Sequence, residues 1–244
     1  MSLNILDSAS VLFVHAHPDD ETISTGALIA EFVARGATVW LLTATRGERG
    51  EVVAGPLSAL EGTAELSIER DRELRCAIET LGLTDQFWLG EPPARAAAQA
   101  PRRYLDSGMT WIRPGLAGPA PDSDDAALAV APLAEVTADI AALIAHLRPA
   151  LVVSYDNGGG YGHPDHVRVH DATVQACREN AVPFAEVRGT QAADAEWFDL
   201  RAHLGTVTAA LRCHATQLTV HGTDIVHSGG QREPITTSVG LRLL

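Results

Sequence analysis

The chain has 244 residues and a formal net charge of −13, from 18 basic and 31 acidic side chains. Nucleic-acid phosphates repel such an acidic chain, so we expect no nucleic-acid partner. The length and the hydrophobic fraction of 46% suit one globular domain with a substantial core. No apolar run reaches the length of a membrane span, and the first residues lack the basic and apolar regions of a signal peptide. These features predict a cytoplasmic protein with no membrane span.

The three cysteines are widely spaced, odd in number and embedded in helical patterns. They are Cys76, Cys177 and Cys213. Spacing of this kind matches neither a paired disulfide framework nor a zinc-binding cysteine motif. We therefore expect three reduced cysteines that serve in packing.

Strand and helix patterns alternate along the first half of the chain. Apolar runs predict strands at residues 11–15, 38–43 and 86–89, and helical periodicity predicts helices at 21–35 and 64–81. The same patterns return as a helix at 133–147, a strand at 151–155 and a helix at 164–179. This order predicts an α/β fold whose mostly parallel central sheet is covered by helices on both faces.

Two stretches depart from this alternation. Residues 91–125 contain six prolines and three glycines, which favours a loop-rich insert without regular structure. Residues 181–244 hold one helical pattern, at about 196–211, followed by a tail of weak pattern. We therefore expect a core over residues 1–180 and a C-terminal extension, 181–244, that completes the domain.

The sequence His-Ala-His-Pro-Asp-Asp-Glu at residues 15–21 follows the first apolar strand directly. So many charged groups at the end of a buried strand are costly unless something pairs them, and a divalent metal does so well. His17 and Asp20 stand three residues apart across a proline turn, close enough to hold one ion together. Asp19, between them, is then free to act as a base.

A second cluster, Tyr-Gly-His-Pro-Asp-His at residues 161–166, follows another apolar strand. A single His-Pro-Asp turn is most often an ordinary helix start, with Asp as the N-cap and Pro in the first turn. Asp20 and Glu21 could likewise serve only the dipole of the following helix. Two such turns favour two halves of one metal site, because ligands bind beyond the carboxyl ends of parallel strands.

The paired signature, residues 17–21 with residues 162–166, resembles that of the PIG-L/LmbE-like family of zinc-dependent deacetylases. The resemblance implies a Rossmann-like three-layer fold and removal of an acetyl group from N-acetylglucosamine-type conjugates. Residues 12–15, 43–52, 106–109, 158–166 and 214–217, with Arg70, Glu73 and Leu74, are similar to members that deacetylate N-acetylglucosaminyl-inositol in mycothiol biosynthesis. The likeness covers about the first 180 residues, and the tail only at 214–217.

The resemblance also implies roles for individual residues. His17, Asp20 and His166 match the zinc ligands, a set that iron(II) would also suit. Asp19 matches the general base. His163, charged and oriented by Asp165, would stabilise the oxyanion and protonate the leaving amine, with help from Tyr161.

By the same match, Arg70, Asp106 and, more weakly, Glu51 fall at positions that contact the substrate. Each has a structural alternative. Arg70 belongs to a charge run of the kind that usually forms a solvated helix face, and Asp106 lies in a loop where Asp often shapes a turn. His15 is expected to lie beside the site without binding metal, and His214, His221 and His227 to be surface or packing residues.

The sequence therefore predicts a zinc-dependent hydrolase of a small N-acetyl sugar conjugate. Two other functions remain open: an amidase that cleaves mycothiol-type thiol S-conjugates, and a metal-binding member without catalysis. A structural zinc site is usually closed by four ligands and needs neither a base nor an acid, so Asp19 and His163 count against the last alternative. Homo-oligomerisation also remains open.

Overall fold

The apolar run at residues 11–14 is buried because it forms the middle of β1 (Ser10–His15), a strand with a parallel neighbour on each side. The computed structural model describes residues 5–121, 125–189 and 193–244. β1 lies in a seven-stranded sheet with the order β3-β2-β1-β6-β7-β12-β8. The other strands are β2 (Thr38–Thr43), β3 (Asp85–Trp88), β6 (Leu151–Ser154), β7 (Phe184–Arg188), β8 (Glu196–Asp199) and β12 (Ser238–Leu243).

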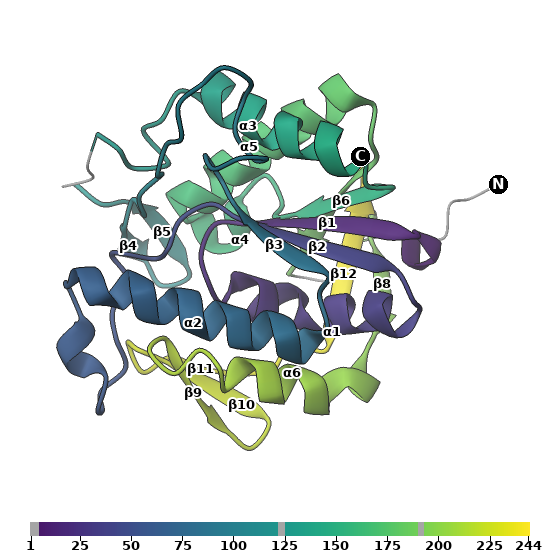
Figure 1. Ribbon diagram of the computed structural model, residues 1–244. Coiled ribbons are helices and arrows are strands. Elements are labelled where there is room, and N and C mark those ends of the chain that lie inside the picture. Colours follow the sequence, from purple (N-terminus) through teal and green to yellow (C-terminus); the bar gives the residue numbers. More distant parts are fainter. Residues whose placement is uncertain (1–4, 122–124, 190–192) are drawn as a thin grey trace.

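Helices cover both faces of this sheet, as Figure 1 shows. α1 (Asp20–Ala34) and α2 (Ala64–Leu81) lie on one face with α6 (Leu204–Leu211) packed against them, and α3 (Leu133–Leu147) and α5 (Pro164–Asn180) lie on the other. Alternate residues of β1 enter different cores: Val11 and Phe13 belong to the first, and Leu12 and Val14 to the second. The predicted three-layer α/β fold with a mostly parallel sheet is confirmed.

The direction of the chain across the sheet reverses between β1 and β6. β1, β2 and β3 succeed one another toward one edge, whereas β6 and β7 run parallel to them toward the other. A reversal of this kind leaves a crevice at the carboxyl ends of the two central strands. Both histidine-rich turns emerge there, since one follows β1 and the other follows β6.

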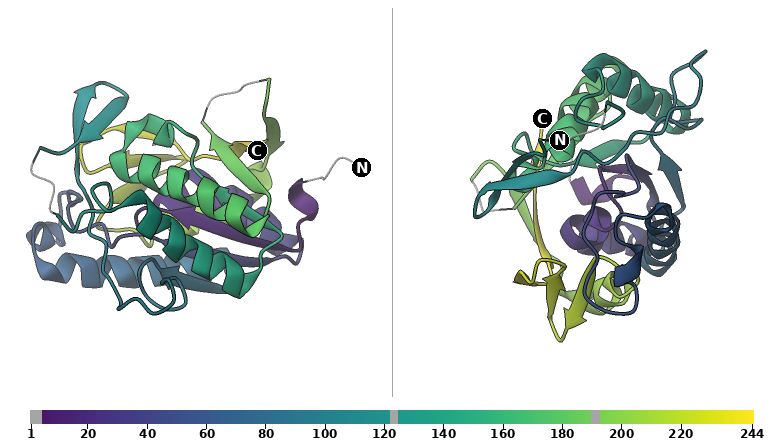
Figure 2. Two further views of the ribbon diagram at one scale, coloured as in Figure 1. Left: turned by 90° about the horizontal axis from the view of Figure 1, so that it is seen from above. Right: turned by 90° about the vertical axis from the view of Figure 1, so that its left-hand side faces the viewer.

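The loop-rich prediction for residues 91–125 is wrong at its centre. Here β4 (Met109–Arg113) and β5 (Leu116–Pro119) form an antiparallel hairpin outside the main sheet, visible in both views of Figure 2. The pair turns at Pro114 and Gly115, which has a φ of 78°. Pro114 lies at the turn and Pro119 ends β5, where a missing N–H costs little, and the other four prolines of the insert lie outside the hairpin.

The predicted helix at 196–211 is wrong in its first half. Residues Glu196–Asp199 form β8, and a 3₁₀ turn, η3 (Arg201–His203), separates this strand from α6. Phe198 pairs with Val239 of β12 and is buried. Pairing with the edge of the sheet thus makes a strand of a segment whose own sequence does not strongly favour one.

The tail of weak pattern also acquires structure through pairing. It forms a second sheet of β9 (Leu218–His221), β10 (Asp224–His227) and β11 (Arg232–Pro234) before β12 returns to the main sheet. The remaining short elements are η1 (Ile5–Asp7), η2 (Ser58–Leu60) and α4 (Gly159–Gly162).

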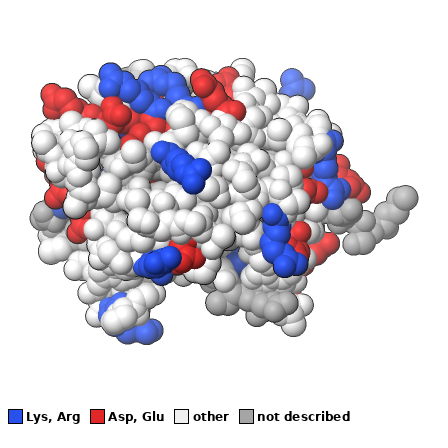
Figure 3. All heavy atoms as spheres, turned by 90° about the horizontal axis from the view of Figure 1, so that it is seen from below, with Lys and Arg blue, Asp and Glu red and all other residues white. Residues whose placement is uncertain are grey.

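Residues other than Lys, Arg, Asp and Glu make up most of the face that α6 and the small sheet of β9, β10 and β11 share, as Figure 3 shows. Within the described residues, every helix is too short or too polar to cross a bilayer.

The prediction of three reduced cysteines is wrong for two of them. Cys76 of α2 and Cys213, just after α6, form a disulfide with a Cα–Cα distance of 5.7 Å. They are 137 residues apart in sequence and meet because α6 packs across α2. Cys177 is a buried free thiol, as expected.

Under denaturing conditions without reductant, we expect a thiol reagent such as DTNB to titrate one cysteine per chain, and three after reduction. Cys76→Ser and Cys213→Ser should lower the free energy of unfolding by similar amounts, about 2–4 kcal/mol, because each releases the same cross-link on a long loop. Three reactive thiols in the unreduced chain would contradict the disulfide.

Candidate metal centre and active site

Three donor atoms from the two histidine-rich turns form a nearly equilateral triangle. His17 Nδ1 and His166 Nε2 each lie 3.3 Å from Asp20 Oδ2, and 3.4 Å from one another. A metal bound tetrahedrally at 2.0–2.1 Å separates its ligand atoms by about 3.3–3.4 Å. The triangle therefore has the dimensions of three corners of such a site, with the fourth corner left for water or substrate.

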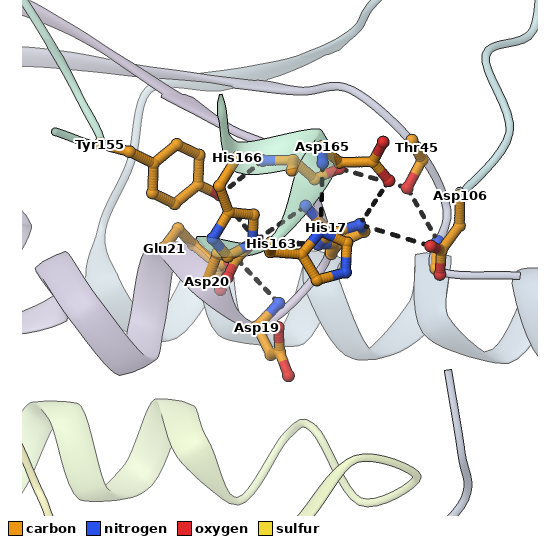
Figure 4. A network of polar contacts seen from close by, with 12 residues as sticks. His17, Asp19, Asp20, Glu21, Thr45, Asp106, Tyr155, His163, Asp165 and His166 are labelled. Carbon is orange, nitrogen blue, oxygen red and sulfur yellow. Dashed lines mark hydrogen bonds and ion pairs between the residues drawn. The ribbon is translucent and has the colours of Figure 1, made fainter. Parts of the chain in front are cut away.

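The second nitrogen of each histidine is held by another group, which turns the first nitrogen toward the triangle. His17 Nε2 lies 3.1 Å from Asp165 Oδ2, and His166 Nδ1 lies 3.2 Å from the carbonyl oxygen of Gly159. Figure 4 shows both imidazoles facing Asp20. Metal-binding histidines are typically oriented in this way by a carboxylate or a carbonyl group.

Tyr155 supports the other two ligands. Its hydroxyl donates to Asp20 Oδ2 at 2.7 Å and accepts from the Ala16 amide at 2.7 Å, and its ring stacks on His166 at a centroid distance of 4.1 Å. Sequence reasoning placed Tyr155 only at the end of a strand. Its position at the carboxyl end of the strand beside β1 is the signal that could have found it.

Two other groups of donors gather among the described residues: His17, His163 and His166, and His17 with Asp106, His163 and Asp165. The second would use His17 Nε2, which already faces Asp165. In the first, His163 would replace an ionised carboxylate that takes hydrogen bonds from both Tyr155 and the His17 amide. The set with Asp20 leaves these contacts in place and gives the ion a negative ligand.

Asp19 is the N-cap residue of α1, but its side chain does not cap the helix. Its side chain makes no capping hydrogen bond, and in Figure 4 its carboxylate points away from the three ligand side chains. The backbone of Asp19 has a φ of 106°, a conformation that costs a non-glycine residue about 1–3 kcal/mol. Burial and the neighbouring Asp20 raise the pKa of Asp19 to about 7, which suits exchange of a proton near neutral pH.

His163 begins α5 as its N-cap. Its Nδ1 accepts a hydrogen bond from the amide of Asp165 at 3.2 Å, so this nitrogen carries no proton and Nε2 carries the ring N–H. Burial, together with His17 and His166, lowers the pKa of His163 to about 3. The hydrogen bond accepted at Nδ1 and the lowered pKa favour a neutral His163, whereas a charged ring was expected from the sequence.

Asp165 contacts His163, as the sequence led us to expect, but through its backbone amide rather than through its carboxylate. The carboxylate is fully buried, faces His17 and accepts hydrogen bonds from the amide and the hydroxyl of Ser107. The Asp165 carboxylate thus orients one donor of the triangle. Ser107, which sequence reasoning did not single out as a site residue, brings the insert at residues 91–125 to the centre.

Tyr161 lies at the outer edge of the site in the short turn α4. It is 38% exposed, and its ring lies 5.3 Å from that of His166 and 5.7 Å from that of Trp111 on β4. Burial and nearby Asp20 raise its pKa well above the usual value, so the hydroxyl is a donor under ordinary conditions. Tyr161 is placed to reach a bound substrate.

Arg70 is buried, which excludes the solvated helix face proposed as its alternative role. Its guanidinium donates to the carbonyl oxygens of Gly47 and, at 3.1 Å, of Glu51, so it fastens the loop after β2 to α2. Gly47 and Gly50 lie so close to this guanidinium that a Cβ on either would collide with it. Arg70 therefore fixes the conformation of the loop after β2.

Glu51 is exposed on that loop and accepts from the Ser228 hydroxyl at 3.2 Å. It lines a hollow of about 260 Å³ with Glu48, Arg49, Gly50, Glu61 and Gly62.

Asp106 lies nearer the centre than a rim residue would. It is 5% exposed, its Oδ1 lies 3.6 Å from His17 Nε2, and its Oδ2 accepts from the Arg49 amide at 3.2 Å. Asp106, Asp165 and Asp20 thus surround His17 with three carboxylates, a concentration of negative charge that favours a cation.

Sequence reasoning also missed the role of Glu21 and His214. Both are fully buried, and His214 Nε2 lies 3.0 Å from Glu21 Oε1. The expectation that His214 is a surface or packing residue is therefore incomplete. His221 is exposed, His227 pairs with Glu233 on the small sheet, and His15 contacts Thr25 rather than a metal donor.

Comparisons with known proteins show which family this chain is similar to. The model of the PIG-L family, described as GlcNAc-PI de-N-acetylase, matches residues 12–177. The 1D-myo-inositol 2-acetamido-2-deoxy-alpha-D-glucopyranoside deacetylase of Kineococcus radiotolerans is 50% identical over 176 residues, which are 72% of this chain and 46% of that protein. The chain thus spans about half the length of that relative.

A deacetylase of the same name, numbered 1, from Saccharopolyspora erythraea is 37% identical over 243 residues, covering 85% of this chain and 77% of that protein. Among solved structures, the N,N'-diacetylchitobiose deacetylase of Pyrococcus horikoshii aligns with a TM-score of 0.60 and 20% identity. The alignment covers 85% of this chain and 70% of that one. At this identity the structural likeness concerns the fold.

If the donor triangle holds the metal, the purified chain should retain about one divalent ion, and His166→Ala should retain little, because one of three ligands is lost. Tyr155→Phe should keep the ion but weaken its binding about 10–100-fold, since it removes only a partner of Asp20. Metal analysis after dialysis against a graded chelator measures both. His221→Ala, at an exposed histidine, is the control, and stoichiometric metal in His166→Ala would refute the assignment.

Proposed function

Because this chain belongs to the PIG-L family, we propose that it is a metal-dependent hydrolase that removes the acetyl group from an N-acetylglucosamine conjugate. The observation that carries the proposal is the donor triangle of His17, Asp20 and His166, together with Asp19, which adjoins Asp20 in the chain and makes no side-chain capping hydrogen bond. A metal site with three protein ligands and an adjacent base is typical of hydrolysis rather than of structural support.

Two imidazoles and one carboxylate suit zinc best, and iron(II) would fit the same donors. When bound, the ion would supply a water of lowered pKa and polarise the acetyl carbonyl. The remaining chemistry falls to the side chains around the triangle.

Asp19 is the proposed general base. It would take a proton from the attacking water and, once protonated, pass it to the nitrogen of the departing amine. We assign protonation of the departing amine to Asp19 rather than to His163, because the Nδ1 of His163 accepts from the Asp165 amide and its lowered pKa favours a neutral ring. The Nε2–H of His163 would instead donate to the oxygen of the acetyl group as negative charge develops there, with the Tyr161 hydroxyl as a second donor.

The name shared by the relatives points to the conjugate. They are called deacetylases of a 2-acetamido-2-deoxy-glucopyranoside of myo-inositol. We propose a small glycosyl-inositol of this kind as the substrate. Glu51 would meet its hydroxyl groups at the rim, Asp106 would do so nearer the metal, and Arg70 would hold the rim loop in place.

The two other functions predict different assay results. An amidase of thiol S-conjugates would use the same core and cleave a different amide. A member without catalysis would leave Asp19 without a role, and a non-glycine residue kept at positive φ without capping its helix favours a functional one.

We expect the metal-loaded enzyme to release a primary amine from N-acetylglucosaminyl-inositol, measured with fluorescamine. Free N-acetylglucosamine, N,N'-diacetylchitobiose and a thiol S-conjugate complete the panel. Asp19→Asn should retain the metal and lose about 10²–10⁴-fold in kcat, the usual contribution of general acid–base catalysis.

Asp85→Asn makes the same change at an exposed aspartate and should behave as wild type. Cleavage of the S-conjugate alone would favour the amidase. Near-normal turnover in Asp19→Asn would remove Asp19 as the base.

Arg70→Ala should reduce kcat/KM on the glycosyl-inositol far more than on free N-acetylglucosamine, because the loop that Arg70 fastens carries the rim beyond the sugar. Steady-state kinetics on both substrates measure the difference. Arg72→Ala is the matched control, since this neighbour on α2 is 67% exposed and forms an ion pair with Glu69 on the same helix. Equal losses on both substrates would place Arg70 in general folding instead.

A further inference from the structure

A buried contact between an imidazole and a carboxylate connects the Asp19 turn to the C-terminal third of the chain. His214 Nε2 lies 3.0 Å from Glu21 Oε1, and both side chains are inaccessible to solvent. The Thr22 hydroxyl also donates to Glu21 Oε1. A buried carboxylate without a partner is strongly destabilising, so the His214 imidazole is what makes Glu21 tolerable at this position.

The other oxygen of Glu21 acts on Asp19. Glu21 Oε2 accepts a hydrogen bond from the Asp19 amide at 3.0 Å, and the Asp19 carbonyl accepts from the amides of Thr22 and Ile23 at 2.9 and 2.8 Å. The peptide groups on both sides of Asp19 are therefore fixed. Since a non-glycine residue rarely adopts a φ of 106°, these contacts, rather than local preference, direct the Asp19 side chain.

The segment that carries His214 is itself anchored by hydrogen bonds. It begins the segment 214–217, in which the amide and hydroxyl of Thr216 donate to Glu73 of α2 at 2.6 and 2.7 Å. The Thr216 carbonyl accepts from the Val53 amide at 2.9 Å, and the side-chain Nε2 of Gln217 lies 3.3 Å from His214 Nδ1. His214 thus meets Glu21 from a segment anchored to α2 and to the loop after β2.

We propose that His214 is a positioning residue that acts through Glu21 to hold the Asp19 backbone in the conformation that presents its carboxylate as the base. The inference rests on the proposed function in taking Asp19 as that base. His214 lies outside the donor triangle, and its imidazole contacts Glu21, Thr22 and Gln217 rather than a metal donor. Its effect should therefore appear in the rate of the chemical step and not in metal retention.

The first test compares His214→Leu with His214→Gln in the metal-loaded enzyme. Leu removes the donor to Glu21, so kcat should fall about 10–100-fold, the usual effect of a small misplacement of a catalytic group, with KM and metal content unchanged. Gln keeps an N–H within reach of Glu21 and should recover most of the rate. His221→Leu makes the same substitution at an exposed histidine of β9 and should match wild type.

The second test asks whether His214 acts only through Asp19. In an Asp19→Asn background, adding His214→Leu should cause no further loss of kcat, because residues that act through one group are non-additive. A further loss of 10-fold or more in that background would overturn the proposal. So would a loss of metal content in His214→Leu or the absence of any rescue by Gln.

A third measurement does not depend on turnover. Amide hydrogen exchange at Asp19, followed by NMR in the substrate-free holoenzyme, should be faster in His214→Leu than in wild type and His221→Leu. Unchanged exchange would overturn the proposed contact. A wild-type enzyme inactive on the whole substrate panel would refute the proposed function, while this measurement would still decide whether His214 fixes the Asp19 turn.

Discussion

The contact between the Asp165 carboxylate and His17 Nε2, at 3.1 Å, determines which ring nitrogen faces Asp20 and His166. Asp165 comes from the turn after β6, and His17 comes from the turn after β1. Their contact therefore fixes the position of one turn relative to the other. A carboxylate buried this completely needs several partners, and Ser107 supplies two more hydrogen bonds. The same anion therefore also ties down the insert between β3 and α3.

Helix α2 organises the opposite side of the site. Arg70 and Glu73 are three residues apart and face the same way, as the helical repeat requires. Arg70 fastens the loop after β2, and Glu73 fastens the segment 214–217 through Thr216. The Asp19 turn, with its unfavourable backbone, is thus enclosed by segments that are themselves anchored by hydrogen bonds, which is how strained residues persist in folded proteins.

Local patterns were sufficient for the elements that carry the site. The strand at 38–43 and the helices at 64–81 and 133–147 occur with the predicted bounds, because each has a clear period and a definite end. The two His-Pro-Asp turns were recognisable because their residue types are unusual at the ends of apolar strands. Prediction failed at residues 109–119 and 196–199, where pairing with another strand supplies the stability that the local sequence lacks.

From residue types and spacing alone, the chain specifies an α/β sandwich, two turns at one edge of its sheet and the residues able to hold a metal there. It does not specify which groups those residues face. That the Asp165 carboxylate faces His17, that Arg70 is buried, and that Cys76 meets Cys213 all depend on packing between distant elements. The partnership of Glu21 with His214, 193 residues further along, has the same origin. Buried polar groups need hydrogen-bond partners, and this requirement arises only when the helices and the sheet pack together and exclude water. Local sequence therefore cannot specify which distant residue becomes the partner.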